Sequence, residues 1–278
     1  MFAQTFLIVW RESVEALLVV GILHAWLVRD PGGRRAIRYL WGGVVAGLGG
    51  AVALSIVLMR LGAILPPEGQ DYFQAGLILT AAALIVQMVF WMRRHGAALK
   101  WHLEEQLTTQ LRYGRLWGVF VIALIAVIRE GAETVIFLYG VLAASQGTSG
   151  EVVAGIAVAL TVAAATYAAV QLGGRYLSWR LFFRLTEAML LLLACALLVK
   201  GVDHLVSLGL LPYADPLWDT SPLLDDMSPF GGIVADLTGY RAVPDRVTVA
   251  TWVLYWSAIV AGCRAQTRRM RELAHKTA

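Results

Sequence analysis

The chain has 278 residues, of which 59% are hydrophobic and 15% charged, and its mean hydropathy is +0.68. This composition indicates a membrane protein and argues against a soluble globular domain. The net charge of +4 does not indicate nucleic-acid binding, because the basic residues sit in short loops between apolar runs. The two cysteines fall in or at the end of such runs, so they indicate neither a disulfide framework nor a thiolate metal site.

Seven apolar runs follow one another along the chain, each close to the roughly 20 residues that a helix needs to cross a bilayer. We therefore predict an all-α, polytopic membrane protein with seven transmembrane helices. The runs cover approximately residues 2–28, 39–60, 73–92, 116–144, 152–174, 185–207 and 247–264.

The loops between these runs alternate in charge. Lysine and arginine concentrate after the first, third and fifth runs and in the tail after the seventh. The positive-inside rule therefore predicts an outside N-terminus and a cytoplasmic C-terminus. Segment 96–113 carries leucine at four-residue steps, which predicts an amphipathic helix along the cytoplasmic membrane surface.

The first and fourth runs each contain the pattern Arg-Glu-x-x-Glu, at Arg11–Glu15 and at Arg129–Glu133. A charge at the centre of a transmembrane helix costs about 2.5 to 3.5 kcal/mol, so these side chains must face protein, water or an ion. Residues three and four apart share one helix face. Each helix thus offers two carboxylates with a guanidinium at their edge.

If the two helices face each other, Glu12, Glu15, Glu130 and Glu133 converge into a cage for a cation that prefers oxygen ligands. Arg11 and Arg129 would neutralise part of this negative charge and tune the site without binding the ion. The four glutamates are the candidate metal ligands, and the two arginines are the candidate charge-tuning residues.

The two motifs open two similar units of three runs, at about 1–92 and 116–207. Because each unit has an odd number of runs, the second would insert upside down, and inverted repeats of this kind hold their site near the membrane midplane. An acidic outer loop, 208–246, and a last helix, 247–264, complete what we expect to be a single transmembrane domain over 1–278. Prolines in the loop argue against a further span.

The sixth run carries Glu187 near its cytoplasmic start and Asp203 and His204 near its outer end. Local ion pairs, Arg184 with Glu187 and Lys200 with Asp203, explain the carboxylates without any function. The alternative is that Glu187 is an exit ligand and that Asp203 or His204 is an entry ligand.

Met88 and Met92 lie four residues apart in the third run. Two thioethers at this spacing are compatible with a ladder for a soft metal such as copper. Methionine that fills a helix interface is the more common situation, and we favour it.

These features together resemble the high-affinity iron permeases of bacteria and fungi, whose hallmark is two membrane-embedded Arg-Glu-x-x-Glu helices. Three further stretches are similar to the bacterial members, and the resemblance covers nearly the whole chain. They are Met88–Arg93, Trp218–Ser221 and Gly239–Pro244.

The resemblance implies iron uptake across the bacterial cytoplasmic membrane, with the motif glutamates as iron ligands and iron as the transported substrate. It also implies periplasmic partners, an oxidase or an iron-binding subunit. Two positions depart from the family pattern. Ser13-Val14 replaces the usual Gly-Leu of the first motif, and Gln74, beside Asp71, stands where bacterial members commonly have a glutamate. Asp71 and Gln74 are therefore further candidate entry positions.

Three hypotheses remain at this point. The first and favoured one is a permease for iron, with manganese or lead as alternative cations. The second is an intramembrane enzyme with a carboxylate-bound metal, which the lack of an accompanying intramembrane histidine disfavours. The third is a structural membrane subunit, in which Arg–Glu pairs join helices. We expect no enzyme activity, no permanently bound cofactor, and membrane lipid but no nucleic acid as a partner.

Overall fold

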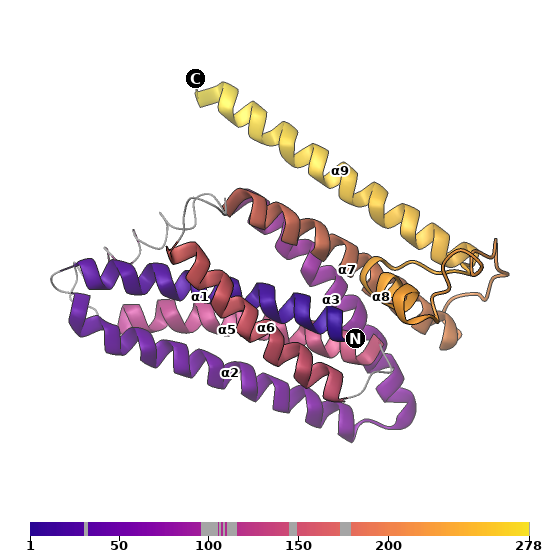
Figure 1. Ribbon diagram of the computed structural model, residues 1–278, viewed down its shortest axis with the longest axis horizontal. Helices are drawn as coiled ribbons and strands as arrows, with labels where there is room; N and C mark the ends of the chain where they lie inside the picture. The colour runs from indigo at the N-terminus through magenta and orange to yellow at the C-terminus, as the bar shows by residue number, and fades with distance from the viewer. Residues whose placement is uncertain are drawn as a thin grey trace.

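The computed structural model describes residues 1–30, 33–95, 105, 107, 109, 116–144, 149–172 and 179–277. Within these residues the chain is helical, apart from the 208–246 segment and short turns, and the only strand-like feature is one isolated bridge. The elements are α1 (Phe2–Arg29), the 3-10 helix η1 (Gly33–Ala36), α2 (Ile37–Ile64), α3 (Pro67–His95), α5 (Leu116–Ala144), α6 (Ser149–Leu172), α7 (Trp179–Ser207), α8 (Pro229–Thr238) and α9 (Arg246–Thr277) (Figure 1).

Five of these helices are long and apolar enough to cross a membrane: α2, α3, α6, α7 and α9. The polytopic, all-helical class is therefore confirmed. Helices α1 and α5 are just as long, with 28 and 29 residues, but each carries the three charges of its motif in its middle turns. Their membrane insertion remains a prediction.

The helix ends differ from the sequence-based spans. The last helix runs from Arg246 to Thr277, well beyond the predicted end at residue 264. The residues after 264 are mostly good helix formers and contain no glycine or proline, so nothing in the sequence ends the helix there. The amphipathic helix predicted over 96–113 lies outside the described residues, except for three helical positions, of which Leu107 is buried.

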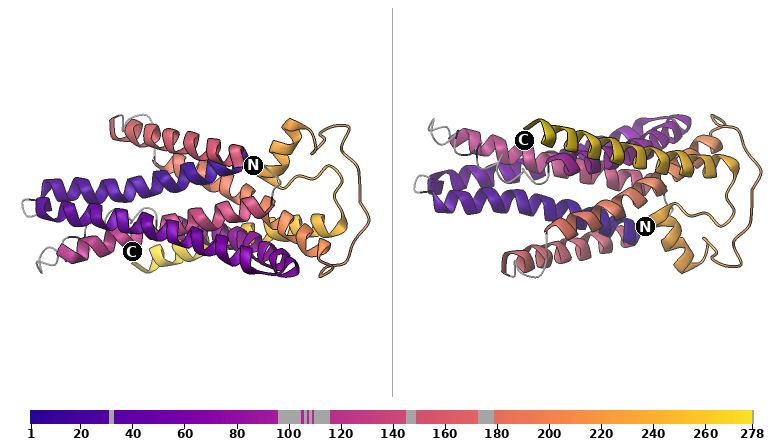
Figure 2. Two further views of the ribbon diagram at one scale, coloured as in Figure 1. Left: turned by 90° about the horizontal axis from the view of Figure 1, so that it is seen from below. Right: turned by 90° about the horizontal axis from the view of Figure 1, so that it is seen from above.

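The bundle is built around α1 and α5, which lie side by side and run in opposite directions (Figure 1). Helix α6 packs on α1, α2 packs on α5, and α3 packs against both α5 and α7. The N-terminus, the turn from α2 to α3 and the 208–246 segment lie at one end of the bundle, and the connection from α1 to α2 lies at the other (Figure 2).

Close approach of α2 to α5 depends on glycine. A Cβ atom on Gly43 would lie 2.4 Å from the carbonyl oxygen of Phe120 and 2.8 Å from the Cβ of Ala123. The small-residue pattern of this helix therefore serves packing, as small residues commonly do between membrane helices. The main core cluster joins α1, α3, α5, α7 and α9 and includes Ile8, Ile85, Met88, Phe137, Leu193 and Ile259.

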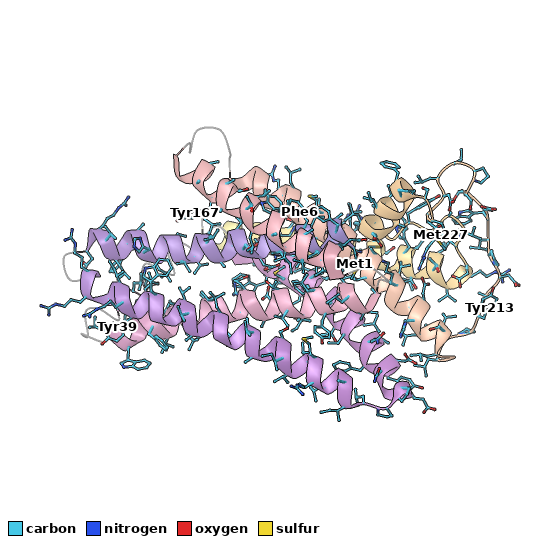
Figure 3. The ribbon with its side chains drawn as sticks, turned by 60° about the horizontal axis from the view of Figure 1, so that its bottom comes forward. Met1, Phe6, Tyr39, Tyr167, Tyr213 and Met227 are labelled. Carbon is cyan, nitrogen blue, oxygen red and sulfur yellow. The ribbon has the colours of Figure 1, made fainter. Side chains whose placement is uncertain are left out.

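The acidic 208–246 loop contains a short helix, α8, which the sequence analysis did not predict. Ser228 caps the N-terminus of this helix by accepting a hydrogen bond from the Gly231 amide, and Gly239 ends it in the left-handed conformation. With 10 residues, α8 is too short to cross a bilayer. Tyr213 and Met227 project from this end of the molecule (Figure 3) and are 80% and 89% exposed.

Candidate functional site

The first motif is buried in the middle of α1. The Arg11 guanidinium is only 2% exposed and pairs with both glutamates of its own motif. Its Nη1 donates to Glu12 Oε1 at 2.7 Å, and its Nη2 lies 2.5 Å from Glu15 Oε1. Glu12 is 1% exposed and Glu15 12%. The i to i+4 spacing read from the sequence is therefore realised as an ion pair.

The second motif repeats this arrangement on α5 but is more open. Arg129 Nη2 donates to Glu130 Oε1 at 2.5 Å, and Arg129 Nε lies 3.8 Å from Glu133 Oε1. Glu130 is buried, whereas Glu133 is 22% exposed and Arg129 44% exposed. The two motifs thus have the same internal pairing and different access from outside.

Three of the four motif glutamates come together across the two helices. Glu12, Glu130 and Glu133 each offer a carboxylate oxygen, and these oxygens all lie within 4.8 Å of one another. Glu15 is not part of this trio, although its Oε1 is buried beside Arg11. A cluster of oxygen ligands at this spacing can hold a hard cation.

Unpaired oxygens point to the same conclusion. The Oε2 atoms of Glu12, Glu130 and Glu133 are buried and have no hydrogen-bond partner among the described residues. A buried, unpaired carboxylate oxygen is costly, so it calls for a compensating cation or proton. Each of these glutamates has its other oxygen, Oε1, near its own arginine. In each carboxylate, Oε1 therefore faces an arginine and Oε2 remains available to a cation.

Sequence reasoning missed the contacts that α3 makes to both motifs. Arg11 Nη1 donates to Met88 Sδ at 2.9 Å, and Nη2 donates to Met92 Sδ. Arg129 Cζ lies 4.7 Å from the centroid of a Trp91 ring. Met88 belongs to the main core cluster, which confirms that it fills a helix interface. The only sequence signal was the spacing of the two methionines.

The candidate entry and exit residues lie in different surroundings. Asp71 is exposed near the start of α3. Gln74 lines a cavity of about 410 Å³ between α2, α3 and α5, together with Phe73 and Tyr139. The ring nitrogen Nε2 of His204 is buried and has no hydrogen-bond partner in the described part of the chain.

The ion pairs on α7 join distant segments, contrary to the local pairs that the sequence suggested. Glu187 pairs with Arg93 of α3. Asp203 pairs with Arg241, which comes just before α9, and lies 3.5 Å from the hydroxyl of Thr248. Spacing along one helix predicts which pairs are feasible, but a long arginine from another element reaches the same carboxylate.

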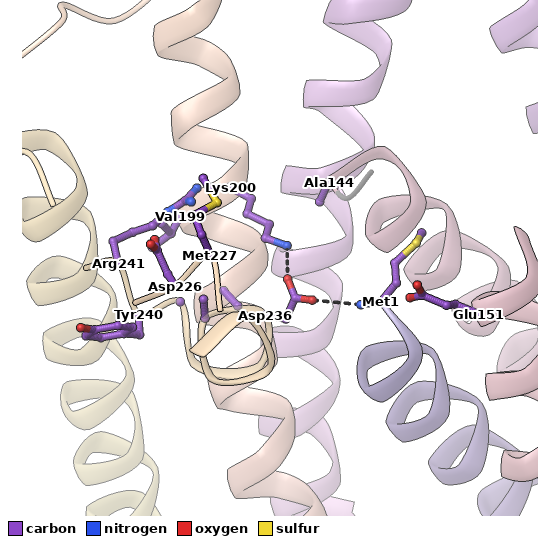
Figure 4. A pocket seen from close by; sticks show the side chains of 14 residues that line it. Met1, Ala144, Glu151, Val199, Lys200, Asp226, Met227, Asp236, Tyr240 and Arg241 are labelled. Atoms are coloured by element: carbon purple, nitrogen blue, oxygen red, sulfur yellow. Dashed lines mark hydrogen bonds and ion pairs between the residues drawn. The ribbon is translucent and has the colours of Figure 1, made fainter. Parts of the chain in front are cut away.

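A cavity of about 510 Å³ lies at the end of the bundle that carries the 208–246 segment, between α7, α8 and the start of α1 (Figure 4). Asp236 of α8 bridges its two sides, because its Oδ1 lies 2.6 Å from Lys200 Nζ and its Oδ2 lies 2.9 Å from the amine of Met1 (Figure 4). Burial alone would raise the pKa of Asp236, but the hydrogen bonds and charges of these two cations outweigh it and lower the pKa. Gln4 Nε2 also donates to the carbonyl of Asp236.

Comparison with known proteins matches nearly the whole chain to one family. The model of the iron permease FTR1 family matches residues 1–266. A ferrous iron permease, EfeU, of Escherichia coli O6:H1 is 30% identical over 258 residues, covering 90% of this chain and 91% of that protein. The protein of the same name from Yersinia pestis is 29% identical over 255 residues, covering 90% and 89%. No solved structure gives a significant match.

Proposed function

The chain belongs to the iron permease FTR1 family, and on this premise we propose that it carries iron into the cell through a site formed by Glu12, Glu15, Glu130 and Glu133. The trio of facing carboxylates supports this proposal most directly. Glu15 would serve as the fourth carboxylate, reached when Arg11 gives up its contact. The family is one of transporters, so the chemistry is binding and release of an ion, with iron as the substrate.

We propose seven spans in one domain, with two inverted repeats and the site near the midplane. Packing supports this, because α1 lies against α6 as α5 lies against α2, and α3 lies against its counterpart α7. Helix depth agrees. At 1.5 Å per residue, Glu130 is about 21 Å from either end of α5, and Glu12 is about 15 Å from the start of α1.

The transport step would begin with an exchange of cations. In the empty site, Arg11 and Arg129 neutralise part of the carboxylate charge. An arriving iron ion would take the unpaired oxygens and repel the guanidiniums, which would loosen their ion pairs. The exposure of Arg129 and Glu133 supports access past the second motif, because a charge facing hydrocarbon is costly and this face would therefore border water.

We propose the bacterial cytoplasmic membrane as the location, with the N-terminus and the 208–246 segment outside and the C-terminus inside. Periplasmic iron-binding and oxidase subunits would deliver the ion to this outer end. Asp71, Gln74, Asp203 and His204 would then lie near entry, and Glu187 near exit. The ion pairs of Asp203 and Glu187 would have to open for either of them to bind an ion.

Ferrous iron is the form to test first, because the relatives named above are called ferrous iron permeases. Carboxylate oxygens also bind other cations, so manganese and lead are the competitors to include.

The test is initial uptake of radiolabelled iron by cells that express the chain, normalised to inserted protein. We expect Glu12→Gln, Glu15→Gln, Glu130→Gln or Glu133→Gln to reduce uptake severely, while Glu105→Gln, a change at an exposed glutamate, has no effect. The cross-helix double, Glu15→Gln with Glu133→Gln, should add little to the single changes, because residues that act as a unit are not additive. Near-normal uptake by all the single variants would rule out a shared site.

A further inference from the structure

One face of α3 lies behind both motif arginines. Met88, Trp91 and Met92 are spaced i, i+3 and i+4, so they share this face. Met88 and Met92 contact Arg11 of α1, and Trp91 lies under Arg129 of α5. A single stretch of less than two turns therefore supports a guanidinium from each half of the molecule. We call these three residues the arginine platform.

The two methionines of the platform share the Arg11 guanidinium with the motif glutamates. The same two nitrogens that face Glu12 and Glu15 also donate to the two thioether sulfurs: Nη1 contacts Glu12 and Met88, and Nη2 contacts Glu15 and Met92. Only 2% of the Arg11 side chain is exposed, so bulk solvent has little access to these contacts. Its position is therefore set by a balance between two carboxylates and two sulfurs.

Arg129 is held in an equivalent way by a different group. Its guanidinium carbon lies 4.7 Å from the ring centroid of Trp91, within the range of a cation–π interaction. It also contacts Glu130 and Glu133. Each arginine thus lies between its own glutamates and a neutral, polarisable surface of α3.

The property of the arginine platform that matters for transport is that its three side chains carry no charge. A carboxylate on α3 would bind the arginines permanently, and a plain alkyl surface would leave them only the motif glutamates to contact. Thioethers and an indole face attract a cation weakly and carry no charge that would compete for iron. We propose that the platform positions both guanidiniums to one side of the carboxylates, so that the Oε2 atoms of Glu12, Glu130 and Glu133 stay available to an incoming cation. The proposal rests on the transport function above and adds three positioning residues to it.

Removing the platform should allow the arginines to close over the glutamates and weaken cation binding. The double change Met88→Leu with Met92→Leu nearly conserves volume but removes both sulfurs. It should raise the apparent Kd for Mn²⁺ about two- to tenfold, the range of one ordinary hydrogen bond, because the two lost bonds are to weak thioether acceptors. Trp91→Leu should raise it about two- to fivefold, the range of a cation–π contact, and Trp91→Phe, which keeps an aromatic face, should retain most of the affinity.

The experiment uses the purified full chain in detergent, with Mn²⁺ as the probe and the EPR signal of free Mn²⁺ as the readout. Each platform change is combined with Arg11→Lys and, separately, with Arg129→Lys, because lysine keeps the charge but loses the planar fork. The methionine changes should lose their effect only with Arg11→Lys, and Trp91→Leu only with Arg129→Lys. Met227→Leu, at an exposed methionine of the outer loop, should not change the Kd in any background.

This crossed pattern separates positioning from general packing, since a packing defect in α3 would be equally large in both lysine backgrounds. Three results would overturn the proposal. The platform changes could keep their full effect in both lysine backgrounds, or the methionine changes could lose their effect with Arg129→Lys and Trp91→Leu with Arg11→Lys. The unsubstituted chain could also show no saturable Mn²⁺ binding. Iron uptake is measured separately in the same variants. If the unsubstituted chain does not transport iron, the proposed function is refuted. If it transports iron normally but the platform changes affect the Mn²⁺ Kd equally in both lysine backgrounds, only the role of the platform is refuted.

Discussion

Unequal burial of the two motif arginines predicts unequal consequences when each is removed. Arg11 is 2% exposed and lies between two carboxylates that are also largely buried. Removing one partner of a buried ion pair costs about 3 to 5 kcal/mol, because the other charge is left without compensation. Arg129 is 44% exposed while its partner Glu130 is buried, so its loss should cost more than the about 0.2 to 1 kcal/mol of a fully exposed pair and less than the loss of Arg11. Arg11→Ala should therefore destabilise the protein more than Arg129→Ala.

Thermal unfolding of the purified chain in detergent measures this difference. At about 2 to 4 °C per kcal/mol for a chain approaching this size, Arg11→Ala should lower the apparent Tm by roughly 6 to 20 °C, and Arg129→Ala should lower it by less. Unfolding of such a protein is commonly irreversible, so all variants are compared at one scan rate.

A second substitution tests the cause. Adding Glu15→Gln to Arg11→Ala removes one of the uncompensated charges, so it should recover part of the lost Tm. Equal losses for the two arginines would refute the reasoning from burial. A further loss in the double variant would show that lost packing around Arg11, and not lost charge compensation, controls stability.

Three more outcomes can be checked. Gly43→Ala should destabilise the bundle by about 1 to 3 kcal/mol, because its Cβ would overlap the backbone of α5, while Gly49→Ala, with no atom within 4 Å of the new Cβ, should be neutral in the same thermal assay. The pKa of Asp236 is lowered, so its ion pairs stabilise the packing of α8 fully above the ordinary aspartate pKa of about 4. This stabilisation is lost as the pH falls through the lowered pKa. Hydrogen exchange of α8 should accordingly be slow at pH 7, and Asp236→Asn should speed it there. A reporter enzyme fused after Ala278 should be active in the cytoplasm, and a periplasmic signal would overturn the proposed orientation.

The sequence alone determined the class of protein and the position of the charged motifs. Composition and run length are properties of the chain itself, and a bilayer permits few solutions for an apolar run of 20 residues, so the all-helical polytopic class could be predicted and is confirmed. The pairing of Arg11 with Glu15 and of Arg129 with Glu133 was also predictable, because i to i+4 geometry is local. Membership of the iron permease family followed from the same motifs and is confirmed.

Contacts between distant segments could be decided only by the tertiary structure. Sequence spacing suggested that Glu187 and Asp203 pair within α7, but folding brings Arg93 and Arg241 to them from other elements. Folding likewise places Asp236 of the 208–246 segment against Lys200. A long charged side chain reaches several positions, so its partner depends on where the helices cross.

The tertiary structure also decided which residues form the site. Four equivalent glutamates were expected, yet only Glu12, Glu130 and Glu133 gather within 4.8 Å, and the two motifs differ in burial. The contacts of α3 to both arginines could not be predicted, since methionine and tryptophan pack in many surroundings and no local pattern identifies their neighbours. Helix periodicity fixes which residues share a face, and only the packing of one helix on another decides what that face meets.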